Sequence, residues 1–295
     1  MFKKLFKKSN SNWLQKGLTF AKEREYLKAI KCFNKVLEND PNCIPALVDK
    51  ATALYALEKY VEALKCCDKA LKIDQNYYNA WYIKGLVLEI MKKHEEALKC
   101  FDKALEIESN DAAVWFNIGS TLNEIGKFDE ALKCYDKALE LEPGDATYWE
   151  DKGNILADLG STKDALKCYD KALNLEPRNY MAWYNKGTLL VGLKDYGTAL
   201  KCFNEALELK RNHPSIWFNK GTTLMDLGRF EEALKCFDKA LELNPDHNLA
   251  WTNKGNTLRK LKKYDKAVKC YNEALKIDPD YKPAKKAKEE LLSPM

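Results

Sequence analysis

The sequence predicts an all-α solenoid of eight antiparallel helix pairs, closed by a C-terminal helix. Three observations predict it: tryptophans at a fixed spacing, small residues at fixed places after them, and apolar residues at helical spacing. The last six tryptophans are 34 residues apart, and Leu47 occupies the one missing place. A period of 20 to 50 residues is typical of stacked structural repeats. The tryptophans are Trp13, Trp81, Trp115, Trp149, Trp183, Trp217 and Trp251.

Small and aromatic residues recur in the same register as the tryptophans. A glycine follows each tryptophan by four residues, and an aromatic residue such as Phe237 recurs in the second half of each unit. One unit departs at three of these places, with Leu47, Ala51 and Cys67. Each departure removes or alters apolar packing area, so we expect this unit to be the least well packed.

Two helices per unit follow from the apolar pattern of a single repeat. Between Phe230 and Leu243 the apolar residues fall three or four apart, as on one face of an amphipathic helix. Gly228 separates this segment from the preceding one, and Pro245 ends it because the residue before a proline leaves the α region. Neither helix can bury its apolar face alone, so neighbouring units must stack.

The chain therefore divides by register into an extension, eight units and a final helix. The first nine residues carry four lysines, and we expect a frayed extension or a partial cap on the first unit. The alternative is a weak anchor to acidic lipid, but the sequence argues against membrane contact there. The expected segments are 1–9 (basic extension), 10–43, 44–77, 78–111, 112–145, 146–179, 180–213, 214–247, 248–281 (repeats) and 282–295 (capping helix).

This pattern resembles the tetratricopeptide repeat family, and the resemblance covers residues 10–281. The family's 34-residue signature places tryptophan, glycine, alanine, an aromatic residue and proline as they stand in this sequence. The resemblance implies a right-handed superhelix in which the first helix of each pair lines the concave side and the second lies outside.

Composition and charge exclude several classes of protein. With 46% apolar and 32% charged residues, the chain has a soluble, folded composition, and no apolar run approaches the roughly 20 residues of a membrane span. The first residues lack the apolar core of a secretory signal, so we expect a cytoplasmic chain. The net charge of +5 lies mainly at the two ends, and a nearly neutral body argues against nucleic-acid binding.

Eight cysteines recur once per repeat, and their spacing argues against disulfides and zinc sites. Equivalent helices of stacked repeats lie about 8–10 Å apart, too far for a disulfide or a shared metal ion. We therefore predict free thiols that fill the core, with no metal and no cofactor. The three histidines stand at turns without a partner motif, so we predict that the chain is not an enzyme. The eight cysteines are Cys32, Cys66, Cys100, Cys134, Cys168, Cys202, Cys236 and Cys270.

The predicted binding residues lie two and five places after the tryptophans, on the inner face. An asparagine side chain has a donor and an acceptor, as each residue of an extended peptide does. This set is similar to the asparagine ladder of superhelical family members, although Asp49, Ile83 and Asp151 depart from it. The alternative is that these amides only bond the neighbouring repeat. The candidate peptide-binding residues are Asn117, Asn154, Asn185, Thr188, Asn219, Thr222, Asn253 and Asn256.

The sequence thus predicts a protein-interaction scaffold or adaptor that binds extended segments of other proteins in a concave groove. Acidic residues in or near the inner helices predict partners with basic segments. A family clamp for C-terminal carboxylates needs lysines or arginines on the inner face, and the matching positions of this chain are not basic. Two alternatives stay open: a self-assembling or membrane-tethered solenoid, and a non-catalytic regulatory subunit of a separate enzyme. The oligomeric state also stays open. The acids are Glu89, Glu124, Glu150, Asp151, Asp158 and Asp226.

Overall fold

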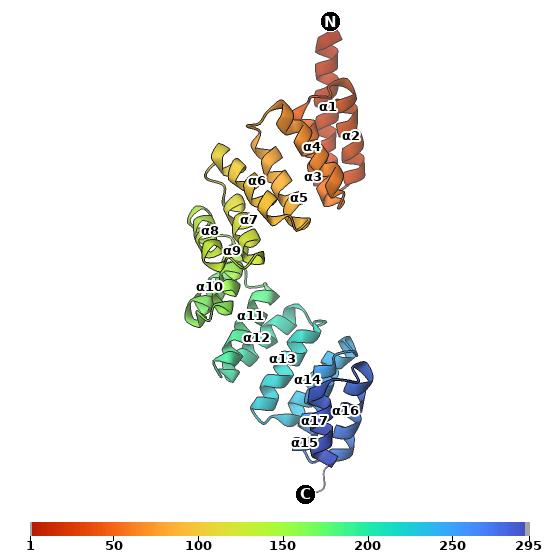
Figure 1. Cartoon of the computed structure of the whole chain (residues 1–295), viewed down its shortest axis with the longest axis vertical. Coiled ribbons are helices and arrows are strands. Elements are labelled where there is room, and N and C mark those ends of the chain that lie inside the picture. The colour runs from red at the N-terminus through yellow and green to blue at the C-terminus, as the bar shows by residue number, and fades with distance from the viewer. Residues whose placement is uncertain (1, 293–295) are drawn as a thin grey trace. The chain divides into compact units, whose positions relative to one another are not determined.

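The computed structural model describes the backbone of residues 2–292 and the side chains of residues 10–292. Over this range the chain is an all-α repeat solenoid of seventeen helices without a strand (Figure 1). It forms two compact units, Met1–Gly144 and Asp145–Met295, each built from four successive helix pairs. No helix in the described range is long and apolar enough to cross a membrane.

The first unit holds helices α1 to α8. Each odd-numbered helix packs against the even-numbered helix that follows it, and α2, α4 and α6 pack against the first helix of the next pair. The basic residues predicted as an extension continue α1 at its N-terminal end, but their side chains lie outside the described residues. The bounds are α1 Phe2–Lys22, α2 Tyr26–Asn39, α3 Ile44–Ala56, α4 Tyr60–Ile73, α5 Tyr78–Ile90, α6 His94–Ile107, α7 Ala112–Glu124 and α8 Phe128–Leu141.

The second unit holds helices α9 to α17 with the same pairing. The first helices of neighbouring pairs also contact one another, so they form one continuous layer within the unit. The bounds are α9 Ala146–Asp158, α10 Thr162–Leu175, α11 Tyr180–Gly192, α12 Tyr196–Leu209, α13 Pro214–Asp226, α14 Phe230–Leu243, α15 Asn248–Lys260, α16 Tyr264–Ile277 and α17 Lys282–Leu292.

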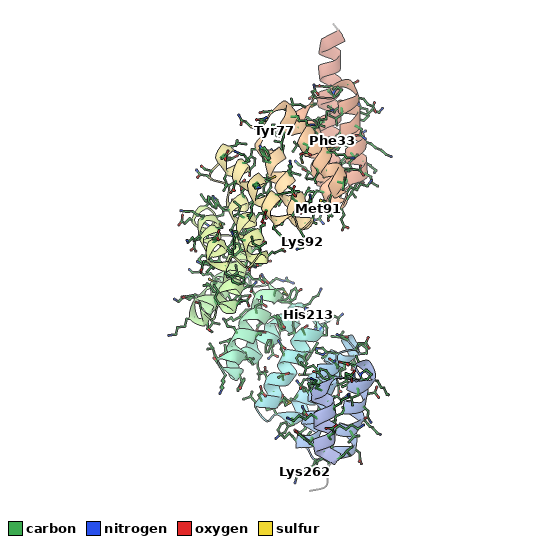
Figure 2. All side chains as sticks on the ribbon, in the orientation of Figure 1. Phe33, Tyr77, Met91, Lys92, His213 and Lys262 are labelled. Carbon is green, nitrogen blue, oxygen red and sulfur yellow. The ribbon has the colours of Figure 1, made fainter. Side chains whose placement is uncertain are left out.

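A glycine–aromatic contact holds seven of the eight helix pairs together. In the seventh repeat, Phe237 of α14 is fully buried, and a Cβ on Gly221 of α13 would lie only 2.9 Å from its ring. Figure 2 labels the equivalent ring of the first pair, Phe33, which is also fully buried. The small residue lets the two helix backbones approach, and the ring fills the space between them. In the second repeat the departing residues Ala51 and Cys67 are likewise fully buried.

Five tryptophans tie their repeat to the one before it. The indole Nε1–H of Trp251 donates to the carbonyl oxygen of Pro245, in the loop that leaves the preceding repeat, at 2.9 Å. Lys254 lies over the indole ring, 4.9 Å from its centroid, and its Nζ contacts Asp238 of α14 at 2.6 Å. A cation over an indole face is attracted to the ring. The junction between repeats therefore combines apolar, ionic and cation–π contacts.

The turn after every first helix places one residue in the left-handed region. Three of these eight residues are glycines, with φ between 73° and 78°, and five carry side chains, with φ between 57° and 62°. Lys92 and Lys262, labelled in Figure 2, belong to the second group. Left-handed backbone strains residues that have a Cβ. The eight residues are Arg24, Glu58, Lys92, Gly126, Gly160, Lys194, Gly228 and Lys262.

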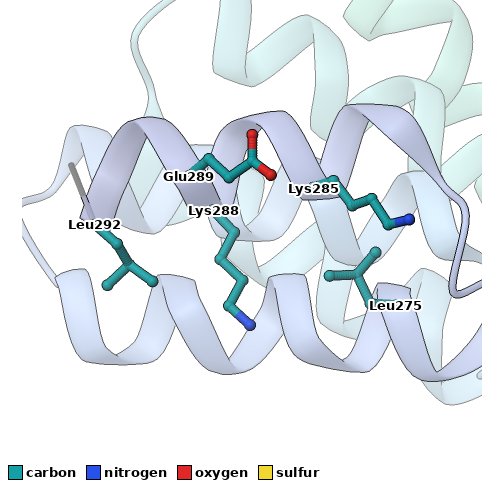
Figure 3. A pocket seen from close by; sticks show the side chains of 5 residues that line it. All are labelled: Leu275, Lys285, Lys288, Glu289 and Leu292. Carbon is teal, nitrogen blue, oxygen red and sulfur yellow. The ribbon is translucent and has the colours of Figure 1, made fainter.

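The last helix covers the end of the second unit. Ala284 and Ala287 of α17 are buried, and Arg259 of α15 pairs with Glu290 at 3.1 Å. A shallow hollow remains between α16 and α17, bordered by two leucines and by charged side chains (Figure 3). The helix thus presents its alanines to the solenoid and lysines to the outside, as a solvating cap does. The hollow is lined by Leu275, Lys285, Lys288, Glu289 and Leu292.

Candidate functional site

The predicted binding residues all lie on first helices, in the layer that these helices form within each unit. Asn117 belongs to α7 in the first unit, and the other seven belong to α9, α11, α13 and α15 in the second. All are half-buried except Thr188, which is exposed. The second unit therefore holds a run of four repeats with polar inner positions, and it is the stronger candidate for a binding site.

The amide of Asn185 is turned toward the preceding repeat. Its Nδ2 donates to Oδ1 of Asn154 at 3.0 Å and to the carboxylate Oε1 of Glu150 at 3.5 Å. A carboxylate oxygen accepts but does not donate, so this contact fixes which end of the amide carries the hydrogens. Both N–H groups of Asn185 are thus used within the protein.

The amide of Asn219 repeats this arrangement one repeat later. Its Nδ2 donates to the hydroxyl of Tyr184 at 3.0 Å and to Oγ1 of Thr188 at 3.4 Å. Asn253 donates in the same direction, to Oγ1 of Thr222 at 3.5 Å. In the first unit, Asn117 donates to the hydroxyl of Tyr82 at 3.1 Å.

These bonds correct the expectation that the amides offer a donor and an acceptor together. For Asn185 and Asn219 both N–H groups point into the repeat junction, and the carbonyl Oδ1 is the group left for a ligand. Threonine follows the same rule, because the hydroxyl of Thr188 donates to the carbonyl oxygen of Tyr184. At Asn185 and Asn219 the inner face of the second unit consequently presents acceptors.

Asn154 and Asn256 have a structural partner that the sequence analysis missed. Each accepts at 2.9 Å from the hydroxyl of a buried tyrosine, Tyr169 and Tyr271 respectively. A buried hydroxyl needs a hydrogen-bond partner. The sequence could have indicated this bond. Repeats that have phenylalanine in place of the buried tyrosine have leucine or threonine in place of the asparagine.

A hollow lies between α9 and α11 of the second unit, where three of the predicted residues come together. Its rim carries the exposed Asp158, and its end is open at Gly192, where an added Cβ would meet no atom within 4 Å. Sequence reasoning did not single out Gly192, although a glycine there departs from the residues at the same register. The hollow is lined by Asn154, Ala157, Asp158, Tyr169, Tyr184, Asn185, Thr188, Leu189 and Gly192.

Burial raises the pKa of four carboxyl groups on the first helices. It raises the pKa of Asp49 and of Asp151 to about 6, because the charged form loses solvation. Burial also raises the pKa of Glu89 and of Glu150, although each accepts a hydrogen bond from a neighbouring side chain. The two aspartates stand where other repeats carry asparagine.

Histidines lie beside the same face, at the start of two helices. His213 (Figure 2) and His247 precede α13 and α15, and their rings contact Tyr184 and Phe218, with centroids 6.0 Å and 4.7 Å apart. Burial lowers the pKa of His247, so its ring is neutral at physiological pH. These rings extend the aromatic part of the inner face.

The cysteines, histidines and acids of the described residues do not gather around a possible metal ion. Across this range no three histidine, cysteine, aspartate or glutamate side chains gather as a metal site. All ten cysteines are free, and burial raises the pKa of Cys100 and Cys236 to about 11. Thiols with such pKa values are protonated at neutral pH and are poor nucleophiles.

Comparison with protein families shows to which family the repeats of this chain belong. The family described as tetratricopeptide repeat matches residues 44–77, 78–111, 112–145, 180–213, 214–247 and 249–281. Two related descriptions of the same repeat match residues 11–43 and 153–194. The chain belongs to the tetratricopeptide repeat family. Members of this family are typically non-catalytic scaffolds for protein interactions.

Solved structures place this tetratricopeptide repeat chain among several solenoids. YrrB, a tetratricopeptide repeat protein with an unusual peptide-binding site, is 33% identical over 65% of this chain and 99% of its own, with a TM-score of 0.58. MamA from Desulfovibrio magneticus RS-1 is 22% identical over 58% of this chain and 96% of its own, with a TM-score of 0.55.

A third solenoid covers more of this chain. The chain matched in the APC/C hetero-tetramer Cut9–Hcn1 is 18% identical over 91% of this chain, which spans 53% of that one, with a TM-score of 0.63. At this identity the likeness shows the fold alone. No curated protein sequence matches the chain.

Proposed function

We propose that the chain is a non-catalytic scaffold that binds extended segments of other proteins along the inner face of its second unit. The observation that carries this proposal is the orientation of the amides. Their N–H groups bond the preceding repeat, as at Asn185 and Asn219, and this leaves carbonyl oxygens at a regular spacing. An extended peptide has backbone N–H groups that such oxygens can accept.

The spacing supports one amide contact for every three residues of ligand. Neighbouring helices in a packed layer lie about 10 Å apart, and an extended chain rises roughly 3.3 Å per residue. Asn185, Asn219 and Asn253 stand in three consecutive repeats at the same register. A bound segment would therefore meet them without bending, and contacts made by its backbone would depend little on its sequence.

The similarity to YrrB adds support, because that relative is described as having a peptide-binding site. The inner face should also prefer ligands with basic residues, because Glu150, Asp158 and Asp226 carry carboxyl groups there. Binding should weaken as salt rises, because solvent-exposed charges are screened.

The proposal is tested with a display library of random twelve-residue peptides, selected on the full chain. An enriched peptide is then titrated by calorimetry against the native chain and against the triple variant Asn185→Ala, Asn219→Ala, Asn253→Ala. Each lost contact should cost on the order of 1 kcal/mol, so affinity should fall by tens to hundreds of fold.

A matched control carries three alanines on the outer helices, Lys171→Ala, Glu205→Ala and Lys239→Ala. These exposed positions share one register in the fifth, sixth and seventh repeats, and affinity should stay unchanged. Because the inner amides also bridge repeats, circular dichroism must show that both variants remain folded at the titration temperature. Equal affinity of a folded inner-face variant and the native chain would contradict the proposal.

A further inference from the structure

We propose that the hollow between α9 and α11 is a subsite for an arginine side chain of the bound segment. This inference rests on the proposed function, since it names the side chain that the groove selects. The hollow lies wholly within the second unit and joins three of the inner-face residues to a carboxylate. Its polar groups, its charge and its open end each specify part of the ligand.

Three of the residues that line the hollow use their donors within the protein. Both N–H contacts of Asn185 go to the preceding repeat, and the hydroxyl of Tyr169 donates to Asn154. The hydroxyl of Thr188 donates to a backbone carbonyl of its own helix. Two acceptors remain, Oδ1 of Asn185 and the carboxylate of Asp158, beside the hydroxyl of Tyr184, which accepts from Asn219. A ligand that brings several donors can therefore bond both oxygens.

The charge of the hollow comes from Asp158, which is exposed and makes no ion pair in the part of the chain that the structure describes. The residue at the same register one repeat earlier, Glu124, differs because Lys92 pairs with it at 2.8 Å. One repeat later the register holds Gly192. The carboxylate of Asp158 thus keeps its charge available for a cationic ligand.

The shape of the hollow suits a long side chain with a planar end. Ala157 and Leu189 provide apolar walls that a methylene stem can cover. Tyr184 provides an aromatic face, and Gly192 leaves open space beside the carboxylate. A guanidinium has five N–H donors in a planar fork and stacks on aromatic rings, whereas an ammonium is a compact point charge. Arginine therefore matches these features better than lysine.

The test uses Nα-acetyl-arginine amide as the probe, titrated into the isotopically labelled full chain and followed by amide NMR shifts. Its neutral counterpart Nα-acetyl-citrulline amide has nearly the same shape and also carries N–H donors. We expect the arginine probe to shift resonances of residues 154–158 and 185–192 and to bind about tenfold more tightly than the citrulline probe.

Two variants and a control test whether the arginine probe binds in the hollow. Asp158→Asn should weaken the arginine probe about tenfold, and Gly192→Leu should abolish its binding by filling the open end. Glu231→Gln, an exposed acid on the outer helix α14 and outside the hollow, should leave the affinity unchanged. Equal binding of both probes, an unaffected Asp158→Asn variant, or shifts confined to other residues would overturn the subsite.

These outcomes separate the subsite from the proposed function. If display selects no peptide but the arginine probe binds as expected, the scaffold proposal fails and the subsite stands. If selected peptides depend on the three inner asparagines but not on Asp158, and the probe leaves residues 154–158 and 185–192 unshifted, the subsite is wrong and the scaffold proposal stands.

Discussion

The ring of Phe101 lies against the backbone of Gly85 so closely that a Cβ at residue 85 would stand 2.5 Å from its Cε1 atom. No side chain larger than hydrogen fits there while the ring stays in place. In the second repeat the same two positions hold Ala51 and Cys67, both fully buried. The smaller Cys67 side chain makes room for the methyl group of Ala51, so two departures from the repeat form one compensated change.

We therefore predict that Cys67→Phe alone destabilises the chain by about 1–3 kcal/mol, because the ring would overlap the Ala51 methyl group. Adding Ala51→Gly should recover most of this loss. Urea unfolding of the two single variants and the double variant measures the coupling, which should exceed about 1 kcal/mol. Additive effects of the two substitutions would show that the positions are independent.

The sequence predicted the repeats and the helix pairs because these depend on residues at fixed spacing along one chain. Gly221 and Phe237 mark a close approach of two helices, and Pro245 marks an end. The direction of the amides could not be predicted in this way. It depends on how Asn219 meets Tyr184 and Thr188 of another repeat, at separations of 35 and 31 residues. Repeat spacing alone does not say which side-chain atoms face each other.

The pairing of Tyr271 with Asn256 supplies a second prediction. The hydroxyl of this fully buried tyrosine donates to Asn256 Oδ1 at 2.9 Å. Asn256→Leu should therefore cost about 1–3 kcal/mol, since the hydroxyl loses its partner. Adding Tyr271→Phe removes the hydroxyl and recreates the pair that the third repeat carries, Leu86 with Phe101.

The double variant Asn256→Leu, Tyr271→Phe should thus unfold within about 1 kcal/mol of the native chain. Thermal or urea unfolding of all four proteins checks this expectation. If the double variant were less stable than Asn256→Leu alone, the hydroxyl would not be the reason for the asparagine.

The left-handed turn residues give a third prediction. Lys194 and Lys262 have φ values of 62° and 57°, whereas Gly228 occupies the equivalent turn at 73°. Lys262→Gly should stabilise the chain by about 0.5–1 kcal/mol, because glycine adopts this backbone without strain. The reverse change, Gly228→Ala, should destabilise it by about the same amount, with chemical denaturation as the measurement.

A glycine away from these turns serves as the control. Gly197 lies in the first turn of α12, and an added Cβ would come no closer than 3.9 Å to another side chain. Gly197→Ala should therefore be neutral or stabilising, since alanine is the better helix former. Destabilisation of similar size at Gly197 and Gly228 would argue against backbone strain as the cause.

The half-buried Asp49 predicts a pH-dependent stability. Burial raises its folded-state pKa to about 6, whereas an unfolded aspartate has a pKa of about 3.9. Between these two values the folded chain holds the proton more tightly than the unfolded chain does. Its contribution to stability therefore falls as the pH rises through this window and stays low above it.

Asp49→Asn removes this penalty and restores the amide found at the same register in other repeats. We expect the variant to be more stable than the native chain by on the order of 1 kcal/mol at pH 7.5, a figure reduced because the side chain is partly exposed. The gain should shrink at pH 4.5, where the buried carboxyl is largely protonated. Paired urea titrations at both pH values measure it, and Asp226→Asn, which replaces an exposed carboxylate, is the control. A gain of the same size at both pH values would mean that the amide forms a new bond and that the buried charge is not the cause.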